Sequence, residues 1–287
     1  MGDVPMTERP LTGKVCLITG ASSGIGRETA LGIARLGATT VLLCRDASKA
    51  RAARDEICAR SGNAAISILL ADLASQVSIR SAAAEFLHTY GVLHILINNA
   101  GVVLRHRVMT EDGYEMTFAV NHLAPFLLTN LLLSALRAGA PSRIITVSSQ
   151  AERAGRIDFD DLHGVRRYRG VRAYAQSKLA NVLFTYELAE RLHGTGVTAN
   201  CVHPGGVATG IVRDYPAWVQ WLWRRHFVTP EVGARTSIYL ASSPDVEDVT
   251  GCYFEPPNRV AKSSPRSYDV ATRERLWALS AELTGLA

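Results

Sequence analysis

A tyrosine and a lysine stand four positions apart in this chain, as Tyr174 and Lys178. Residues four apart lie on one face of a helix, about 6 Å apart along its axis, so both side chains can enter one cleft. The lysine ammonium would then favour the tyrosinate and let the phenol exchange protons near neutral pH. An isolated phenol has a pKa near 10, so lowering it to about 7 needs roughly 4 kcal/mol of differential stabilisation. The pair alone is also compatible with an amphipathic surface helix.

Ser149 and Asn121, upstream of this pair, add a hydroxyl and an amide. Interconversion of an alcohol and a carbonyl changes the charge on one oxygen, so its site needs a proton donor, a second hydrogen bond and an oriented hydride carrier. Tyr174 and Ser149 are side chains of the types that the first two tasks require. The rival of another class is a regulatory protein that binds a cofactor without turnover, but such a sensor has no need of a proton path.

The elements that position these residues alternate between short apolar segments and longer helical patterns. Nearly continuous apolar strands joined by helices predict a parallel sheet covered on both faces. Connection rules then favour an α/β fold with a single doubly wound, Rossmann-type sheet of about seven strands, which binds ligands at the carboxyl ends of its strands. The expected strands are residues 15–19, 39–44, 66–70, 93–97, 143–147 and 197–202, and the expected helices are 25–36, 47–61, 77–90, 113–138 and 173–192.

The composition indicates one globular domain. Of the 287 residues, 47% are hydrophobic, and no linker or internal repeat stands out. We expect a short flexible lead at residues 1–10 and one domain over residues 11–287. The five cysteines form no CxxC pair, and Cys16, Cys44 and Cys201 lie within apolar segments. This pattern indicates core thiols in a reducing compartment.

The chain is expected in the cytoplasm, because residues 1–10 lack the apolar region of a signal peptide. The longest apolar stretch, Phe126–Leu136, is too short and too polar to span a bilayer. The net charge is +5, but the arginines lack the basic and aromatic pattern of a nucleic-acid reader. The histidines show no metal-ligand spacing, so we expect no metal site. We expect the following histidines at the surface or in loops: His106, His122, His163, His193, His203 and His226.

A glycine-rich turn, Thr19–Gly26, follows the first expected strand and opens a helix. Gly20 permits the tight turn, Gly24 lets backbone approach a pyrophosphate, and Gly26 lets the helix pack closely on the sheet. The helix N-terminus offers free N–H groups and partial positive charge to phosphates. A turn of this kind is a weak signal alone, but its place after the first strand predicts a dinucleotide site.

The end of the second strand indicates which dinucleotide binds. NAD sites usually carry a carboxylate there, whereas this strand ends in Cys44 followed by Arg45. Arg27 directly follows Gly26, and two guanidinium groups suit a 2′-phosphate through forked hydrogen bonds. Asp46 is a counter-signal, because it is able to pair with Arg45. The pattern favours NADP(H) over NAD(H).

Several motifs in fixed order make the chain resemble the short-chain dehydrogenase/reductase superfamily, from about Thr12 to the last helix. A narrower similarity, to the retinol dehydrogenase branch, is carried by residues 173–184, 202–205, 229–231 and 239–244. The resemblance implies an enzyme acting on alcohols and carbonyls. Its motifs are Thr19–Gly26, Asn98–Gly101, Asn121, Ser148-Ser149, Tyr174 with Lys178, and Pro204-Gly205.

The resemblance also implies roles for individual residues. Tyr174 would be the general acid in reduction and the base in oxidation, and Lys178 would lower its pKa and bond the nicotinamide ribose. Ser149 would donate to the substrate oxygen, Asn121 would hold a helix irregularity and a water of the proton relay, and Asp72 would meet the adenine edge. Besides Asp72, Tyr174 and Lys178, we predict that the following residues contact the cofactor: Gly20, Ser22, Ser23, Gly24, Ile25, Gly26, Arg27, Arg45, Leu73, Asn98, Ala100, Gly101, Pro204, Gly205, Val207 and Thr209.

Two segments should shape the substrate side. Pro125 should kink the helix beyond Asn121. Aromatic residues crowd 205–228, which we interpret as a lid over a bulky apolar substrate. The alternatives are a helix packed on the protein's own core and, since Arg224 and Arg225 are adjacent, contact with a membrane interface. The aromatic residues are Tyr215, Trp218, Trp221, Trp223 and Phe227.

The segment Glu152–Arg172 lengthens the path between Ser149 and Tyr174. In relatives with such an insertion it covers helices otherwise used for dimer packing, so a monomer and a homodimer both stay open. The predicted function is an NADP(H)-dependent oxidoreductase for a bulky lipophilic alcohol or carbonyl (retinoid-, steroid- or polycyclic-like). The alternative within enzymes is a ketoreductase of specialised metabolism acting on a more polar aromatic ketone.

Overall fold

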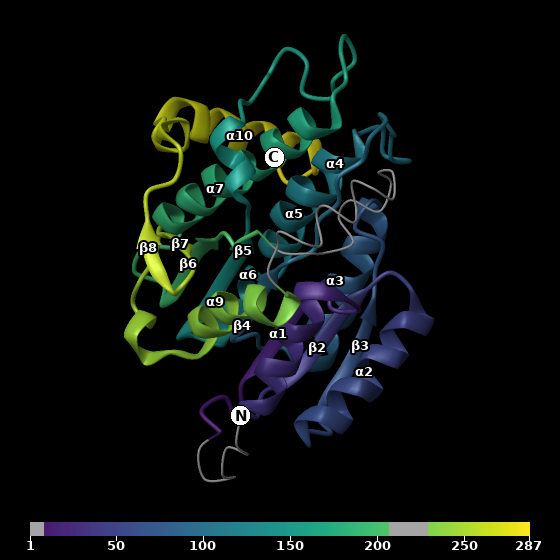
Figure 1. The fold of residues 1–287 in the computed structure, drawn as a ribbon, viewed down its shortest axis with the longest axis vertical. Coiled ribbons are helices and arrows are strands. Elements are labelled where there is room, and N and C mark those ends of the chain that lie inside the picture. Colours follow the sequence, from purple (N-terminus) through teal and green to yellow (C-terminus); the bar gives the residue numbers. More distant parts are fainter. Residues whose placement is uncertain (1–8, 207–228) are drawn as a thin grey trace.

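The computed structural model describes residues 9–206 and 229–287, and its centre is one twisted sheet (Figure 1). The strand order is β3-β2-β1-β4-β5-β6-β7-β8, and all neighbours pair in parallel except β7 and β8. The order reverses between β1 and β4, which is the place where doubly wound sheets bind ligands. The strands are β1 Val15–Thr19, β2 Thr39–Cys44, β3 Ile66–Leu70, β4 Ile95–Asn98, β5 Ser142–Val147, β6 Val197–Val202, β7 Tyr253–Glu255 and β8 Arg259–Ala261.

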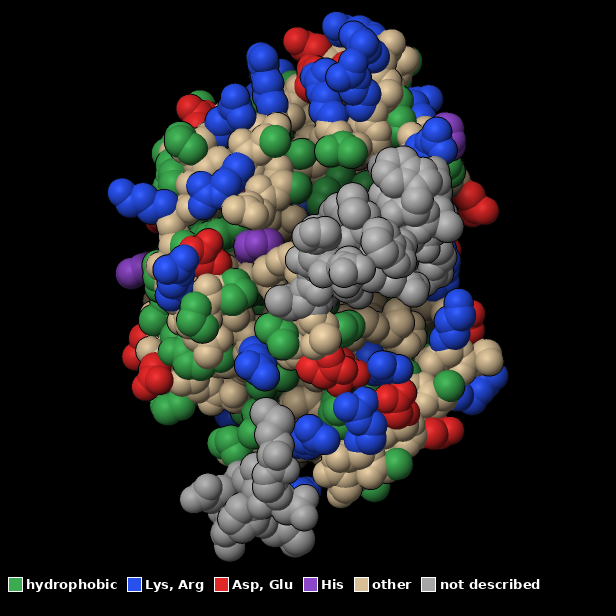
Figure 2. Space-filling model, viewed as in Figure 1, with side chains coloured by type: hydrophobic (Ala, Val, Ile, Leu, Met, Phe, Trp, Pro, Cys, Tyr) green, Lys and Arg blue, Asp and Glu red, His purple; other side chains and the backbone are tan. Residues whose placement is uncertain are grey.

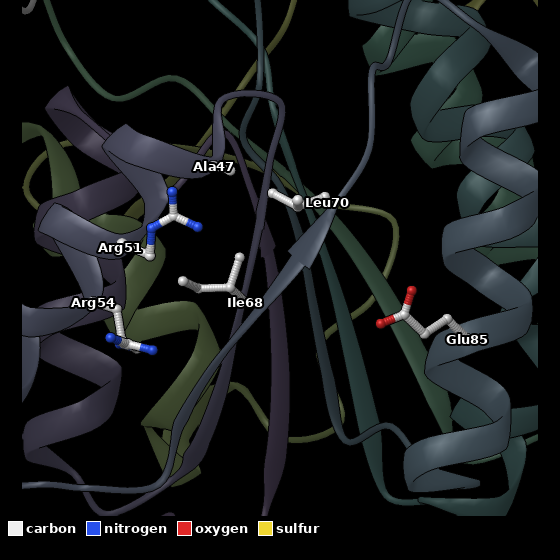
Figure 3. A pocket seen from close by; sticks show the side chains of 6 residues that line it. All are labelled: Ala47, Arg51, Arg54, Ile68, Leu70 and Glu85. Carbon is white, nitrogen blue, oxygen red and sulfur yellow. The ribbon is translucent and has the colours of Figure 1, made fainter.

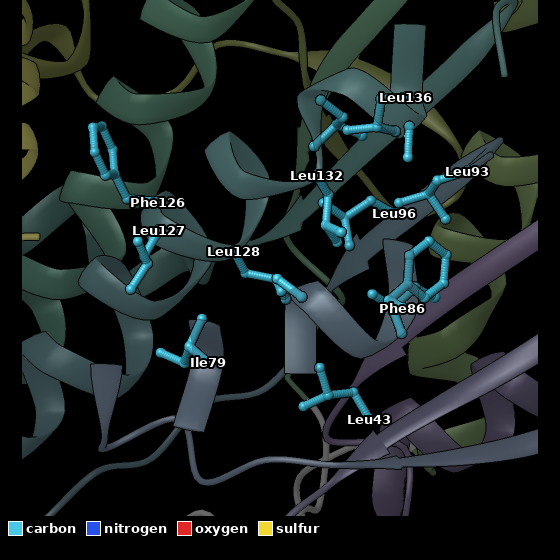
Figure 4. Packing of buried hydrophobic residues seen from close by; sticks show 14 of the residues in the cluster. Leu43, Ile79, Phe86, Leu93, Leu96, Phe126, Leu127, Leu128, Leu132 and Leu136 are labelled. Carbon is cyan, nitrogen blue, oxygen red and sulfur yellow. The ribbon is translucent and has the colours of Figure 1, made fainter. Parts of the chain in front are cut away.

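Helices cover both faces of this sheet because successive strand residues point to opposite sides. Leu17 of β1 packs on the side of α3, α5 and α7, whereas Cys16 and Ile18 pack on the side of α1, α2 and α9. Figure 4 shows the first of these cores, where Phe86 of α3 and Phe126 of α5 lie among leucines from neighbouring elements. The main helices are α1 Gly24–Arg35, α2 Ala47–Ser61, α3 Gln76–Tyr90, α5 Ala124–Leu131, α6 Leu133–Ala138, α7 Gly170–Arg191, α9 Pro230–Ser242 and α10 Val270–Leu283.

The predicted α/β fold with a doubly wound parallel sheet is confirmed, with eight strands in place of about seven. The two short strands β7 and β8 lie outside the expected set, since three residues each give no recognisable alternation. The prediction of one helix over 113–138 was wrong. That stretch consists of the short helix α4, Met116–Phe118, a π-helical turn at Ala119–Leu123, and then α5 and α6.

The last helix, α10, packs across α7 and α5. Trp277 of α10 stacks on Phe184 of α7 and meets Phe126 of α5 edge-on, with ring centroids 5.9 and 4.9 Å apart. Arg273 of α10 pairs with Glu187 of α7, with 2.8 Å between Nε and Oε2. The outer faces of α5 and α7 are therefore partly covered by the chain itself.

All five cysteines are free thiols, and Cys16, Cys44 and Cys201 are buried, as their apolar surroundings predicted. Across the two described ranges, no helix is long and apolar enough to cross a membrane.

Candidate active site

The predicted catalytic residues lie beyond the carboxyl ends of adjacent strands. The glycine turn follows β1, Asn98 ends β4, Ser149 lies two residues after β5, and Pro204 lies two residues after β6. Because β1, β4, β5 and β6 are neighbours in the sheet, these segments share one edge. The helix α7 begins beside them and carries Tyr174 and Lys178 in its first turns.

Lys178 is buried, with 2% of its surface exposed, and its ammonium has a fixed partner. Nζ donates to the main-chain oxygen of Val147, at the end of β5, over 2.9 Å. The Ser148 hydroxyl in turn donates to the main-chain oxygen of Lys178 over 2.8 Å. Burial lowers the pKa of Lys178 to about 8, because the charged form loses its hydration. β5 and α7 are thus joined at this lysine.

The pKa of Tyr174 differs from the value expected from the sequence. Burial raises its pKa to about 12, and a hydrogen bond with Ser149 works in the opposite direction. The ammonium of Lys178 lies 5.7 Å from the centre of the phenol ring. In the chain by itself, desolvation therefore outweighs the hydrogen bond with Ser149, and the pKa of Tyr174 is raised rather than lowered.

Ser149 is held against Tyr174 by a 3₁₀ turn, Gln150–Ala154, which it caps. Its Oγ accepts from the N–H of Ala151 over 3.3 Å, which leaves the hydroxyl hydrogen free to donate. Gly155 ends the turn in close contact with α7. A Cβ on Gly155 would lie 2.5 Å from the carbonyl oxygen of Ala175, so only glycine lets the turn pack here.

Asn121 lies within the π-helical turn and is fully buried. Its Oδ1 accepts from the N–H of Val102 over 2.7 Å, and its Nδ2 donates to the Val102 oxygen over 2.9 Å. The same Nδ2 donates to Oγ of Ser177 over 3.0 Å, and that hydroxyl donates to the Tyr174 oxygen over 2.8 Å. Asn121 thus connects the segment after β4 to α7. Sequence reasoning missed Ser177, although it lies within the motif that gave Tyr174 and Lys178.

The prediction that His122, next to Asn121, lies at the surface or in a loop was wrong. His122 is 1% exposed, and its Nε2 lies 2.8 Å from Oγ of Ser280 on α10. Phe118, Phe126 and Phe184 surround the ring. Burial lowers its pKa to about 3, so the imidazole is neutral at physiological pH.

The glycine turn is built to receive an anion. Gly20 and Gly24 have φ values of +69° and +56°, in the left-handed region. A Cβ on Gly26 would lie 2.4 Å from the Gly20 oxygen. Ser23 precedes α1 without a side-chain capping bond, so the first N–H groups of the helix are free to bind phosphate oxygens. The residues present therefore fit a dinucleotide pyrophosphate.

Asn99 and Thr19 hold this turn in place, and sequence reasoning gave neither of them a role. Nδ2 of Asn99 donates to the Thr19 oxygen over 2.9 Å, and Oγ1 of Thr19 accepts from the N–H groups of Asn99 and Ala100, both over 3.0 Å. Asn98, expected at the cofactor, is 3% exposed, and its Nδ2 donates to Thr129 of α5 over 3.0 Å. Gly101 borders Lys178, since a Cβ there would lie 3.4 Å from Nζ.

The two arginines predicted at a 2′-phosphate have different surroundings. Arg45 is exposed beyond β2, and Asp46 is engaged elsewhere: it caps α2 and pairs with Lys49 at 3.6 Å. Within residues 9–206 and 229–287, no carboxylate pairs with Arg45. Arg27 is held by Glu56 at 2.9 Å and by Glu28 at 3.2 Å.

The other predicted cofactor residues follow β3 and β6. Asp72 follows β3, and its Oδ1 accepts from the N–H of Ala74 over 2.9 Å. Leu73 is partly buried beside it, and Gly205 has a φ of +85° after the buried Pro204. Val207, Thr209 and the expected lid from 207 onward lie outside the described residues, as does the lead up to residue 8. No group of three or more His, Cys, Asp or Glu able to hold a metal occurs in the described part of the chain.

One surface cavity of about 330 Å³ lies away from this site (Figure 3). It opens at the sheet edge, where Arg51 and Arg54 of α2 face Leu70 of β3 and Glu85 of α3. None of the predicted catalytic residues lines it. The strand ends remain the better candidate for chemistry.

Comparisons with known proteins agree with this geometry. The sequence model of a family described as short chain dehydrogenase matches residues 14–220. Retinol dehydrogenase 12 of Mus musculus is 46% identical over 287 residues, which cover 99% of this chain and 90% of that protein. The crystal structure of an uncharacterised protein from Mycobacterium paratuberculosis superposes with a TM-score of 0.79 and 34% identity, over 96% and 94% of the two chains. The Pseudomonas aeruginosa RhlG/NADP complex gives 0.70 and 25% identity, over 90% and 98%.

Proposed function

Because this chain belongs to the short-chain dehydrogenase family, it is an oxidoreductase, and we propose that it interconverts an alcohol and a carbonyl with NADP(H). One observation carries the proposal: Tyr174 and Lys178 of α7, Ser149 after β5 and Asn121 of the π-helical turn come from three separate segments and converge at the carboxyl edge of the sheet. A surface helix that bore Tyr174 and Lys178 by chance would not bury the lysine against β5.

The proton chemistry follows from the desolvation of the partly buried Tyr174. With a pKa of about 12, the phenol is protonated at neutral pH and is therefore ready to act as a general acid toward a substrate oxygen. Ser149 donates a second hydrogen bond to the same oxygen. When bound, NADPH supplies the hydride to the carbonyl carbon. Lys178, fixed on Val147, holds positive charge beside the phenol and favours its ionised form after the proton has left.

Two features of the nucleotide end support NADP(H). The second strand ends in Cys44 rather than in a carboxylate, and the exposed Arg45 follows it. A guanidinium at this place suits a 2′-phosphate through forked hydrogen bonds. A similar chain has been solved with NADP, which supports the same assignment. We further propose a cytoplasmic location, because five free thiols suit a reducing compartment.

For the substrate we propose a bulky lipophilic alcohol or carbonyl, since similar proteins carry the name retinol dehydrogenase. The alternative is a ketoreductase for a more polar aromatic ketone. The test is NADPH oxidation, followed by near-ultraviolet absorbance, with retinaldehyde beside a panel of bulky and of polar aromatic ketones. Turnover of the lipophilic compounds supports the proposal, and turnover of the polar ketones alone would replace it with the alternative. NADPH binding without turnover of any compound would favour the regulatory protein.

A further inference from the structure

Four charged side chains form a compact cluster between α1 and α2, close to the glycine turn. Arg27 pairs with Glu28 at 3.2 Å and with Glu56 at 2.9 Å. Arg60 pairs with the same two carboxylates, at 3.2 Å to Glu28 and 2.7 Å to Glu56. Acidic and basic side chains accordingly lie side by side over α1 and α2 in Figure 2. Two cations thus share two anions.

The members of this cluster differ in how strongly they need one another. The Glu28 side chain is only 3% exposed, so its charge must be compensated by a neighbouring cation. Arg60 can compensate this charge without Arg27, because its Nη1 and Nη2 donate to both oxygens of Glu28, over 3.3 and 3.2 Å. Arg27 instead contacts one oxygen of Glu28, Oε1, at 3.2 Å. Arg27 can therefore leave without stranding a buried charge.

Arg27 also lies within reach of the predicted phosphate end of the site. Its N–H donates to the oxygen of Ser23, so it lies one helical turn beyond the start of α1. The N–H of Gly20 donates to the oxygen of Leu43 over 2.9 Å, which places the end of β2 and hence Arg45 beside the same turn. A third carboxylate, Glu231 of α9, also faces the cluster: hydrogen bonds at the start of α9 lower its pKa first, and the charges of Arg60 and Arg27 lower it further.

We propose that Glu56 and Glu28 compete with the 2′-phosphate of the nucleotide for Arg27, and that Arg60 is a positioning residue that releases Arg27 by holding both carboxylates. This inference rests on the proposed use of NADP(H). In this arrangement Arg45 is the permanent phosphate ligand. Arg27 is a second ligand whose availability is set by residues that never touch the nucleotide. Discrimination between NADP(H) and NAD(H) is then tuned from α2.

Calorimetric binding of two adenosine nucleotides tests the inference without any turnover. Adenosine 2′,5′-bisphosphate carries the 2′-phosphate and adenosine 5′-monophosphate lacks it. Glu56→Gln frees Arg27, so we expect binding of the bisphosphate to tighten by about threefold to tenfold and binding of the monophosphate to stay unchanged. Arg60→Gln leaves both carboxylates to Arg27, so we expect the bisphosphate to bind more weakly by a similar factor.

Asp55→Asn is the matched control, because it removes the same charge from the neighbouring position. Asp55 is 67% exposed at its side chain and pairs with Arg54 at 2.8 Å, outside the cluster. Equal effects of Asp55→Asn and Glu56→Gln would mean a general field of charge and would overturn the competition. A wild-type chain that binds the two nucleotides equally well would instead refute the NADP(H) assignment itself. Glu56→Gln and Asp55→Asn both keep the pair between the buried Glu28 and Arg60, so the test does not depend on the stability of Arg60→Gln.

Discussion

Asn121 and Ser177 are 56 residues apart in the chain and are joined by a 3.0 Å hydrogen bond from Nδ2 to Oγ. The same serine hydroxyl donates to the main-chain oxygen of Tyr174, three residues earlier in α7. The π-helical turn is thereby fixed to the helix that carries the proposed general acid. The position of Tyr174 therefore depends on Ser177, which itself has no part in the chemistry.

Tyr174→Phe should remove the proton donor and leave the nucleotide site intact. We expect turnover to fall by about 10²- to 10⁴-fold, the usual contribution of general acid–base catalysis. NADPH binding, followed by fluorescence titration, should be unchanged because the glycine turn is untouched. Retention of wild-type turnover by this variant would exclude Tyr174 as the acid.

Ser177→Ala should loosen the connection between Asn121 and α7. The Ser177 hydroxyl makes two hydrogen bonds, and their loss costs about 1–3 kcal/mol of stability. We expect turnover to fall roughly tenfold as Tyr174 loses its fixed position. The control is Ser61→Ala, since the Ser61 hydroxyl also donates to the backbone of its own helix, over 2.6 Å, but far from the site. Urea unfolding and steady-state kinetics separate the two effects. If both variants lost turnover equally, the effect would be general destabilisation.

Two glycines should separate binding from chemistry when each is replaced by alanine. Gly26→Ala places a Cβ 2.4 Å from the Gly20 oxygen, so we expect loss of NADPH binding. Gly155→Ala places a Cβ 2.5 Å from the Ala175 oxygen, which moves the turn that bears Ser149. That variant should bind NADPH normally and turn over at least tenfold more slowly. Each variant serves as the control for the other, and loss of NADPH binding in both would contradict the separation.

The stability of the protein should depend on the ionisation of Lys178. Its pKa is lowered from 10.5 to about 8 in the folded chain, so between these values the unfolded chain binds more protons than the folded chain. The free energy of unfolding should therefore rise with pH, by about 2 kcal/mol from pH 8 to pH 10 for this group. Urea unfolding of wild type and Lys178→Met isolates the contribution, because the variant lacks the titrating amine. Parallel curves for the two proteins would refute it.

Most strands could be predicted from the sequence because buried parallel strands consist of nearly continuous apolar residues. The bounds 15–19, 39–44, 66–70 and 197–202 agree with β1, β2, β3 and β6. The apolar pattern did not predict the π-helical turn, although the family resemblance implied a helix irregularity at Asn121. Residues 113–138 read as one helix, since one extra residue in a turn leaves no mark on an apolar pattern.

Contacts between distant segments escaped the sequence for a different reason. Arg27 was placed beside a phosphate from its position after the glycines, but its partner Glu56 lies on another helix and becomes its neighbour only through packing. The same holds for the pKa of Tyr174: the spacing to Lys178 predicts proximity, whereas the extent of burial, which decides the direction of the shift, comes from the tertiary structure.

The contact between His122 and Ser280 spans 158 residues, and it has a consequence for the order in which the molecule forms. During synthesis, the π-helical turn and α7 emerge well before α10, so their aromatic surface waits for Trp277 to cover it. A nascent chain stopped before residue 270 would hold all four proposed catalytic residues and would still expose Phe126 and Phe184. The active site therefore becomes rigid only after α10 has been synthesised, and until then this apolar surface is a binding target for chaperones.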